Sequence, residues 1–315
     1  MRNRENLICS VTWSRIMTNS NKAAQRWFMV ALFVAALAAP PSAPAAAFLF
    51  PSLGAAGSFA MFGLTASSGY AISQTGATIN GNEGISIDTG SGAITINSPN
   101  TVTGSLYQAQ NGQFTGQDSG LAVTNAGLMT TANNDYTTAL GLIAGATATQ
   151  TIITQINGAQ NITGNGSGIA VANVIDFTNA GAATLNNANL TLNGGANDYF
   201  IVRISALSMT LSGTGSLALG TGVIASHVIF DFVNAAATVT VSAGATDSLS
   251  GYIIDPNGAM TLGGTTVVNG ELIGKTMTLN ANTTVNGVTP EPSTLFLIGG
   301  ALIAIGAGSK RLRRG

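Results

Sequence analysis

The chain has 315 residues, of which 45% are hydrophobic and only 7% are charged, and its formal net charge is −1. This composition excludes intrinsic disorder, which needs low hydrophobicity and high net charge, and a coiled coil, which needs many charged residues. It also argues against a nucleic-acid-binding protein, which would carry a basic patch. With a single Cys, Cys9, the chain is not a disulfide scaffold.

The basic residues are concentrated at the two ends of the chain. Five of them precede position 27, and four lie among the last six residues. Arg203 and Lys275 are the basic residues between Phe48 and Thr289, where ten acidic residues occur, so this central part carries a net charge of −8. A charge of that sign repels nucleic acid, which is therefore not an expected partner.

Residues 1–47 are predicted to form a secretory signal. Lys22 and Arg26 precede an apolar run over residues 27–39, and small residues follow as far as Ala47. A charged flank, a short apolar segment and an Ala-x-Ala site are typical of such a signal, and a bilayer span would need roughly 20 apolar residues. Met17 is an alternative start of translation, which would remove Cys9. Either start predicts export through the inner membrane.

Residues 48–289 are predicted to form one mostly β domain, a right-handed β-solenoid. Thr favours strands because its branched Cβ fits a pleated surface, and Asn and Gly supply turns. Short runs in which Thr alternates with apolar residues recur at 93–96, 190–192, 209–211, 239–241, 260–262 and 277–279. Steps of 30, 21 and 17 residues separate the Thr residues of the last four runs, and the last two steps are close to one solenoid turn. A β-sandwich is the alternative fold, because it also uses many short strands.

A segment near residues 124–144 breaks the strand pattern and predicts a helix. Its apolar residues follow helical spacing: Leu128, Ala132, Tyr136, Ala139, Leu140 and Ile143. Gly120 and Gly145 bound the segment. We expect this helix to lie along the solenoid and to cover apolar surface or a sheet edge that other chains would otherwise contact.

Several motifs of this domain resemble two known families. The segments HVIFDF (227–232), SGYIIDPNGAMTL (250–262), VNGELIG (268–274) and FAMFG (59–63) are similar to the choice-of-anchor A family, an extracellular adhesive domain found with several C-terminal anchors. The segments LGAAGSFA (53–60) and INGNEGIS (79–86), the inserted helix and the Asn/Gly-rich coils resemble the ice-binding β-solenoid family. The two families share an architecture, and the PNG (256–258) and NG (269–270) pieces favour the first resemblance.

The C-terminal residues 290–315 are predicted to be a sorting signal. Pro290, Glu291 and Pro292 precede an apolar stretch over residues 294–309 and a basic tail with Lys310, Arg311, Arg313 and Arg314. An apolar stretch followed by basic residues is a stop-transfer pattern, which places the basic end in the cytoplasm. The three features in this order resemble the PEP-CTERM signal of Gram-negative bacteria. That resemblance implies a transmembrane helix at 294–309, an exosortase that cleaves near 290–292, and a cell that exports polysaccharide. An ordinary C-terminal membrane helix is the alternative.

The domain offers few groups for catalysis. His227 and Asp231, four residues apart on one predicted strand, would lie roughly 13 Å apart, which is too far for a direct hydrogen bond. Asp176, Asp198, Asp231 and Asp255 fall on different predicted turns and could stack, but no calcium loop or phosphate loop accompanies them. Asp198 follows a Gly-rich segment, where an acidic turn residue is expected. We expect no enzymatic activity, no cofactor and no metal ion.

The remaining candidate is the surface of the solenoid. Thr210, Thr240, Thr261 and Thr278 hold equivalent positions in successive turns. Two residues earlier, on the same outward face, are Ser208, Thr238, Ala259 and Thr276. Turns stacked about 4.8 Å apart would align them into a flat ladder of hydroxyl and methyl groups. Such a face suits ice or a polysaccharide, although outward Thr is also ordinary in strands. The candidate binding residues are Thr210, Thr238, Thr240, Thr261, Thr276 and Thr278.

These observations favour a non-enzymatic, exported β-solenoid, anchored by its C-terminal membrane helix and then found at the cell surface or in the extracellular matrix. It would act as a surface adhesin or a matrix component. Its expected partners are an exosortase-type sorting enzyme, the membrane, and an extracellular polysaccharide or surface ligand. The alternative is an ice-binding protein that uses the Thr ladder.

Overall fold

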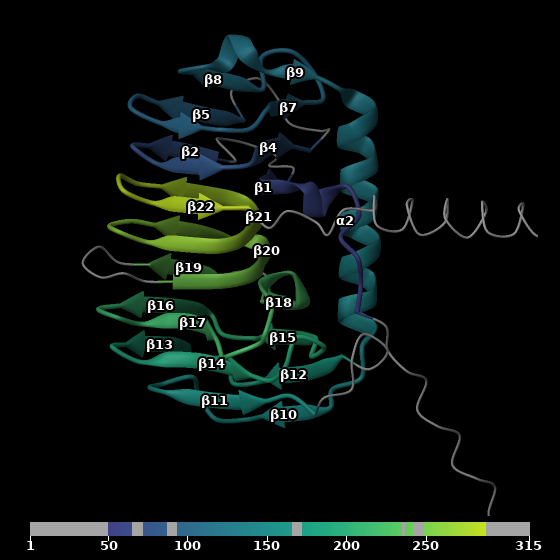
Figure 1. Ribbon diagram of the computed structural model, residues 1–315, viewed down its shortest axis with the longest axis vertical. Coiled ribbons are helices and arrows are strands. Elements are labelled where there is room, and N and C mark those ends of the chain that lie inside the picture. The colour runs from purple at the N-terminus through teal and green to yellow at the C-terminus, as the bar shows by residue number, and fades with distance from the viewer. Residues whose placement is uncertain are drawn as a thin grey trace, which may run out of the picture. The chain divides into compact units, whose positions relative to one another are not determined.

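The computed structural model describes residues 50–64, 72–86, 93–165, 172–234, 237–241 and 248–287. Within them the chain forms a stack of β-coils with one α-helix, α2 (Ala126–Gly145), along its side (Figure 1). The prediction of a mostly β fold with a helix packed alongside is confirmed. The predicted signal segment and sorting signal lie outside the described residues. Among the described residues, no helix is both long enough and apolar enough to cross a membrane.

The strands of successive coils pair in parallel, which the antiparallel β-sandwich alternative does not allow. The stack has three faces. The face against α2, here called the covered face, contains β10 (Gln150–Ile152), β12 (Asn173–Phe177), β15 (Phe200–Ile204), β18 (Val228–Phe232), β1 (Phe59–Gly63), β4 (Asn82–Ile85), β7 (Leu106–Gln108) and β9 (Val123–Thr124).

A second face, here called the threonine face, contains β13 (Ala182–Asn186), β16 (Ser208–Ser212), β19 (Thr238–Val241), β2 (Ile72–Thr75), β5 (Ile94–Asn97) and β8 (Phe114–Gly116). The third, here called the asparagine face, contains β11 (Gln160–Thr163), β14 (Asn189–Asn193), β17 (Ser216–Leu219), β22 (Thr284–Asn286), β3 (Thr78–Asn80) and β6 (Thr101–Val102). Two long strands, β20 (Ser248–Leu262) and β21 (Val267–Leu279), bend through all three faces. Short 3-10 turns form η1 (Ala56–Ser58), η2 (Ser119–Leu121) and η3 (Ala225–His227).

The coils do not stack in the order of the sequence. The first coils of the domain sit on the last ones, because β3 pairs with β22 and both β1 and β2 pair with β21. In Figure 1 the yellow strands of the C-terminal part therefore lie directly beside the purple and blue strands of the N-terminal part. Helix α2 then carries the chain along the stack to its other end, where β10 begins.

Helix α2 begins with a side-chain cap and turns one apolar stripe toward the coils. The Asn125 side chain accepts a hydrogen bond from the backbone N–H of Leu128 (3.0 Å), as expected at an N-cap. The buried stripe is Met129, Ala132, Tyr136, Ala139 and Ile143. The predicted stripe is confirmed at four of these positions. Leu128 and Leu140 are half-buried at its margin, and Met129 takes a core position that the prediction missed.

Apolar side chains fill two layers of the molecule. The first lies inside the coils, where Leu211, Val241, Leu262 and Leu279 align in register and are all buried. The second lies between α2 and the covered face. Fully burying one such side chain contributes about 1.5–3 kcal/mol, so both layers are principal sources of stability.

Candidate binding face

The sequence-predicted Thr residues form one straight column on the threonine face. Thr210 of β16 pairs in register with Thr240 of β19, which pairs with Thr261 of β20, which pairs with Thr278 of β21. The predicted steps of 30, 21 and 17 residues therefore do mark successive rungs. Parallel neighbours in a sheet lie about 4.8 Å apart, so the hydroxyl groups repeat at that interval.

The column extends beyond the predicted residues at both ends. Thr184 of β13 pairs with Thr210, and at the other end Ser73 pairs with Thr278. Thr95 and Thr115 follow Ser73 in register, and their Oγ1 atoms are 3.2 Å apart. The complete column is Thr184, Thr210, Thr240, Thr261, Thr278, Ser73, Thr95 and Thr115, and each of these residues is half-buried. We call it the hydroxyl column.

A second column runs beside the first, two residues earlier in each strand. It consists of Ala182, Ser208, Thr238, Ala259 and Thr276, which are aligned rung by rung. Residues two apart on a strand lie roughly 6.6 Å apart, so the two columns form a regular two-dimensional array. The predicted residues Thr238 and Thr276 belong to this array, although Ala interrupts its hydroxyl groups at two rungs.

The face is rigid because buried side chains support every rung. Between the outward residues, Met209, Val239, Met260 and Met277 point into the core, and none is more than 1% exposed. The strand segments of this face contain no Asp, Glu, Lys or Arg, and Lys275 precedes Thr276 at the edge. The arrangement therefore presents Thr methyl groups and hydroxyl groups above a buried apolar layer. Each hydroxyl group can donate and accept hydrogen bonds.

Sequence reasoning missed Ser73, Thr95, Thr115 and Thr184 as members of the face. Residues 93–96 do show the same alternation as the predicted rungs, with Thr95 between two inward Ile residues. That local signal identifies an outward Thr, but it does not reveal which coil lies next to it. The pairing of β2 with β21 joins segments about 200 residues apart, and no short-range pattern encodes it.

The asparagine face carries a different column. Asn80 Nδ2 donates to Asn286 Oδ1 (2.8 Å), and Asn286 Nδ2 donates to Asn269 Oδ1 (2.9 Å). These amides bond to one another along the stack, whereas the threonine face presents hydroxyl and methyl groups. The predicted strand at 190–192 belongs to this third face and not to the hydroxyl column.

The four predicted acidic residues do not form a catalytic cluster. Asp176 and Asp231 flank Arg203 in register on the covered face, and Arg203 binds Asp176 through Nε (2.6 Å) and Nη2 (2.8 Å). Arg203 Nη1 also donates to the carbonyls of Ile143 and Ala144 at the end of α2. Asp198 accepts from the backbone N–H of Gly195 (2.8 Å), so its predicted role as a turn residue is confirmed.

Asp231 and Asp255 are buried and hold protons more strongly than usual. Burial raises the pKa of Asp231 to about 7. The positive charge of Arg203 lowers this pKa, and the negative charge of Asp255 raises it further. Burial also raises the pKa of Asp255 to about 6, although Gly258 N donates to its Oδ1 (2.8 Å). Neither carboxyl reaches solvent, so neither serves a substrate.

Two further buried acids were not predicted. Glu83 lies inside the coils, where Gln74 Nε2 donates to both of its oxygens (3.0 and 2.9 Å). Burial raises the pKa of Glu83 to about 7, and the hydrogen bond from Gln74 opposes the rise. Glu271 is completely buried beside Gly57 of η1, and burial raises its pKa well above the ordinary value. Among the described residues, no group of three or more His, Cys, Asp or Glu side chains is placed to hold a metal ion.

The placement of His227 corrects one prediction. His227 and Asp231 do not share a strand, because His227 ends η3 and β18 begins at the next residue. The His227 ring stacks on Tyr199, with centroids 3.9 Å apart and an interplanar angle of 22°. The ring is half-buried and packs against Tyr199.

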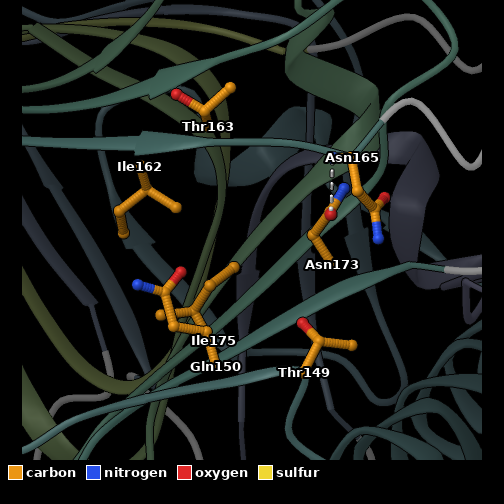
Figure 2. Close-up of a pocket in the computed structure, with 7 residues that line it drawn as sticks. All are labelled: Thr149, Gln150, Ile162, Thr163, Asn165, Asn173 and Ile175. Atoms are coloured by element: carbon orange, nitrogen blue, oxygen red, sulfur yellow. Dashed lines mark hydrogen bonds between the residues drawn. The ribbon is translucent and has the colours of Figure 1, made fainter.

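A shallow cavity of about 150 Å³ lies at the end of the stack where β10, β11 and β12 meet (Figure 2). Its lining is Thr149, Gln150, Ile162, Thr163, Asn165, Asn173 and Ile175. The Asn165 backbone N–H donates to Asn173 Oδ1 (3.1 Å) across it. The lining contains no charged side chain and no aromatic ring, so this cavity lacks the groups that a catalytic site needs.

Several solved structures of ice-binding proteins resemble this chain. One from an Antarctic biological consortium has a TM-score of 0.55 and 18% sequence identity, over 78% of this chain and 94% of its own. A glycosylated ice-binding protein from an Arctic yeast matches with a TM-score of 0.55 and 20% identity, over 78% and 97% of the two chains. The DUF3494 domain of a Shewanella frigidimarina ice-binding protein matches with a TM-score of 0.55 and 20% sequence identity, over 75% of this chain and 97% of its own. Identities at this level establish a shared fold. The sequence matches no protein-family model and no curated protein.

Proposed function

We propose that this protein binds ice through the threonine face. The observation that carries the proposal is the hydroxyl column: eight hydroxyl side chains in register, uncharged, and fixed on a buried apolar base. Ordered water at a protein surface needs hydrogen-bonding groups at fixed positions, and the column supplies them at the repeat of a β-sheet. The likeness in fold to solved ice-binding proteins supports this function over the adhesin function.

The test is thermal hysteresis and inhibition of ice recrystallisation by the purified protein and two variants. Thr240→Tyr places a bulky ring in the centre of the hydroxyl column and should abolish both activities, because binding to a crystal requires a flat face. Thr191→Tyr is the matched control, since Thr191 is also an outward, half-buried strand residue but lies on the asparagine face. The control should keep full activity.

Circular dichroism must show that both variants keep the β-dominated spectrum of the parent. Equal activity of Thr240→Tyr and the parent would move the binding site to another face. A folded parent protein with no activity on ice would reject the proposal and favour the adhesin or matrix function, with polysaccharide binding as the next assay.

We also propose the localisation that the terminal segments predict. The chain is exported by its N-terminal signal, held in the membrane by residues 294–309, and handled by an exosortase at Pro290–Pro292, as the resemblance to PEP-CTERM signals implies. The right-handed coil and the relation to the choice-of-anchor A family belong to the same proposal, which assigns no enzymatic activity and no cofactor. Deletion of residues 289–315 should release the protein into the medium. Retention of the truncated protein by the cells would contradict the anchor.

A further inference from the structure

Three carboxyl groups lie beneath the elements that cover this face, without the partners that an ionised carboxylate needs. Asp231 and Asp255 lie near Tyr136 of α2, and Glu271 lies beside Gly57 of η1. Asp231 belongs to β18, Asp255 to β20 and Glu271 to β21, and none is more than 1% exposed. Asp231 Oδ1, Asp255 Oδ2 and both oxygens of Glu271 have no hydrogen-bond partner within the described residues. An unpaired charge in such a place is very costly, so these groups are held in the neutral, protonated form.

Each carboxyl site also faces a buried tyrosine. The hydroxyl of Tyr136, on α2, has no hydrogen-bond partner within the described residues. Burial is the main cause that raises its pKa, and the negative charges of Asp231 and Asp255 raise it further. Tyr252 pairs in register with Glu271, and burial together with the charge of Glu271 raises its pKa. Negative charge on the carboxyls therefore disfavours ionisation of both hydroxyl groups, which stay neutral.

The surrounding charged groups do little to neutralise this cluster. Arg203, beside Asp231, is already bound to Asp176 and to the end of α2. On the remaining elements, Lys275 follows the covered-face part of β21 and is partly exposed, and His227 ends η3 next to β20. Asp135 of α2 accepts from the Ala55 backbone N–H, and Glu83 points into the coils toward Gln74.

We propose that α2 is a proton-dependent clasp, which stays docked on the covered face while Asp231, Asp255 and Glu271 are protonated and loosens when they ionise. In the neutral form the carboxyls fit an otherwise apolar layer between the helix and the coils. In the ionised form Asp231 and Asp255 repel each other, and solvation of the charges requires the covering helix to move away. The segments of β20 and β21 on the threonine face carry no charged residue, although the same two strands carry Asp255 and Glu271 outside that face.

The direction of the pH dependence follows from the proton balance. The folded protein holds protons on these carboxyls up to a pKa of about 7 for Asp231 and about 6 for Asp255. The unfolded chain releases them near pH 4 (about 3.9 for Asp and 4.3 for Glu). The contribution to stability is therefore complete below about pH 4 and is lost as the pH rises through about 6 to 7.

Hydrogen exchange of the full chain, read by mass spectrometry, tests the clasp. Between about pH 5 and about pH 8, after correction for intrinsic exchange, amides of α2 in the parent protein should lose protection by roughly tenfold or more, because one pKa unit corresponds to a factor of ten. Amides of β16, on the threonine face, should lose much less. The triple variant Asp231→Asn, Asp255→Asn, Glu271→Gln should keep α2 protection constant. Asp118→Asn, an exposed turn residue in the left-handed conformation that Asn tolerates, is the control and should behave as the parent.

Constant α2 protection in the parent over this range would overturn the proposal. Equal loss in α2 and β16 would also overturn it, because a global loss of stability is not a clasp. If the triple variant does not fold, the single variant Glu271→Gln decides the matter. Its α2 amides should lose less protection between about pH 5 and about pH 8 than those of the parent, and an equal loss rejects the clasp.

Discussion

The covered face and the threonine face are built from the same coils and supported by the same apolar interior, yet the molecule uses them in opposite ways. Outward residues of the covered face, such as Val174, Ile201 and Ile229, are completely buried against α2. Outward residues of the threonine face are short hydroxyl side chains that remain open to solvent. The coil therefore determines the positions of the outward side chains. Apolar side chains make a face that is buried against α2, and hydroxyl side chains make a face that stays exposed to solvent.

The largest effect is expected from damage to the interior that both faces share. Leu262 is completely buried beneath the hydroxyl column. Leu262→Ala should lower the free energy of unfolding by about 2–5 kcal/mol, because it removes buried apolar contacts and leaves a cavity. Urea denaturation followed by circular dichroism measures the change.

The neighbouring variant Thr261→Ala sharpens this measurement. Thr261 lies on the outside of the same strand and is half-buried, so its loss should change stability by less than about 0.5 kcal/mol. Similar losses in the two variants would contradict the assignment of inward and outward residues on this face.

A smaller effect is expected where the helix is fastened to the covered face. Arg203→Gln removes the bidentate ion pair with Asp176 and the bonds to the carbonyls of Ile143 and Ala144. The free energy of unfolding should fall by about 1.5–3 kcal/mol, the range for hydrogen bonds to charged groups. Hydrogen exchange should increase first in the last turn of α2.

The conservative variant Arg203→Lys separates charge from geometry. Lys keeps the positive charge but lacks the planar fork that binds Asp176 through two nitrogens. It should recover only part of the loss. Full recovery would show that charge alone holds the end of the helix, and no loss in Arg203→Gln would show that α2 does not depend on this fastening.

Local patterns predicted the parts of this molecule that local physics determines. The alternation around Thr240 and Thr261 identified inward and outward residues, and the spacing from Ala132 to Ile143 identified the buried stripe of α2. The order of the coils in the stack was not predictable from the sequence. The strands at the edges of different coils resemble one another, and long-range packing determines which of them pair. The buried acids escaped notice for a related reason. Glu83 and Glu271 look like surface residues in sequence, and only the tertiary structure encloses them.

The position of the first coils on top of the last has a consequence for synthesis at the ribosome. Asn80 and Asn286 are hydrogen-bonded neighbours, although 206 residues separate them in the chain. The first strands to leave the ribosome can pair with one another, β1 with β4 and β2 with β5, but the edge that β21 and β22 cover stays exposed until the final coil has been made. Growth of the stack from one end to the other is not available to the nascent chain. The junction between β22 and β3, in the middle of the finished stack, cannot form until β22 has been made.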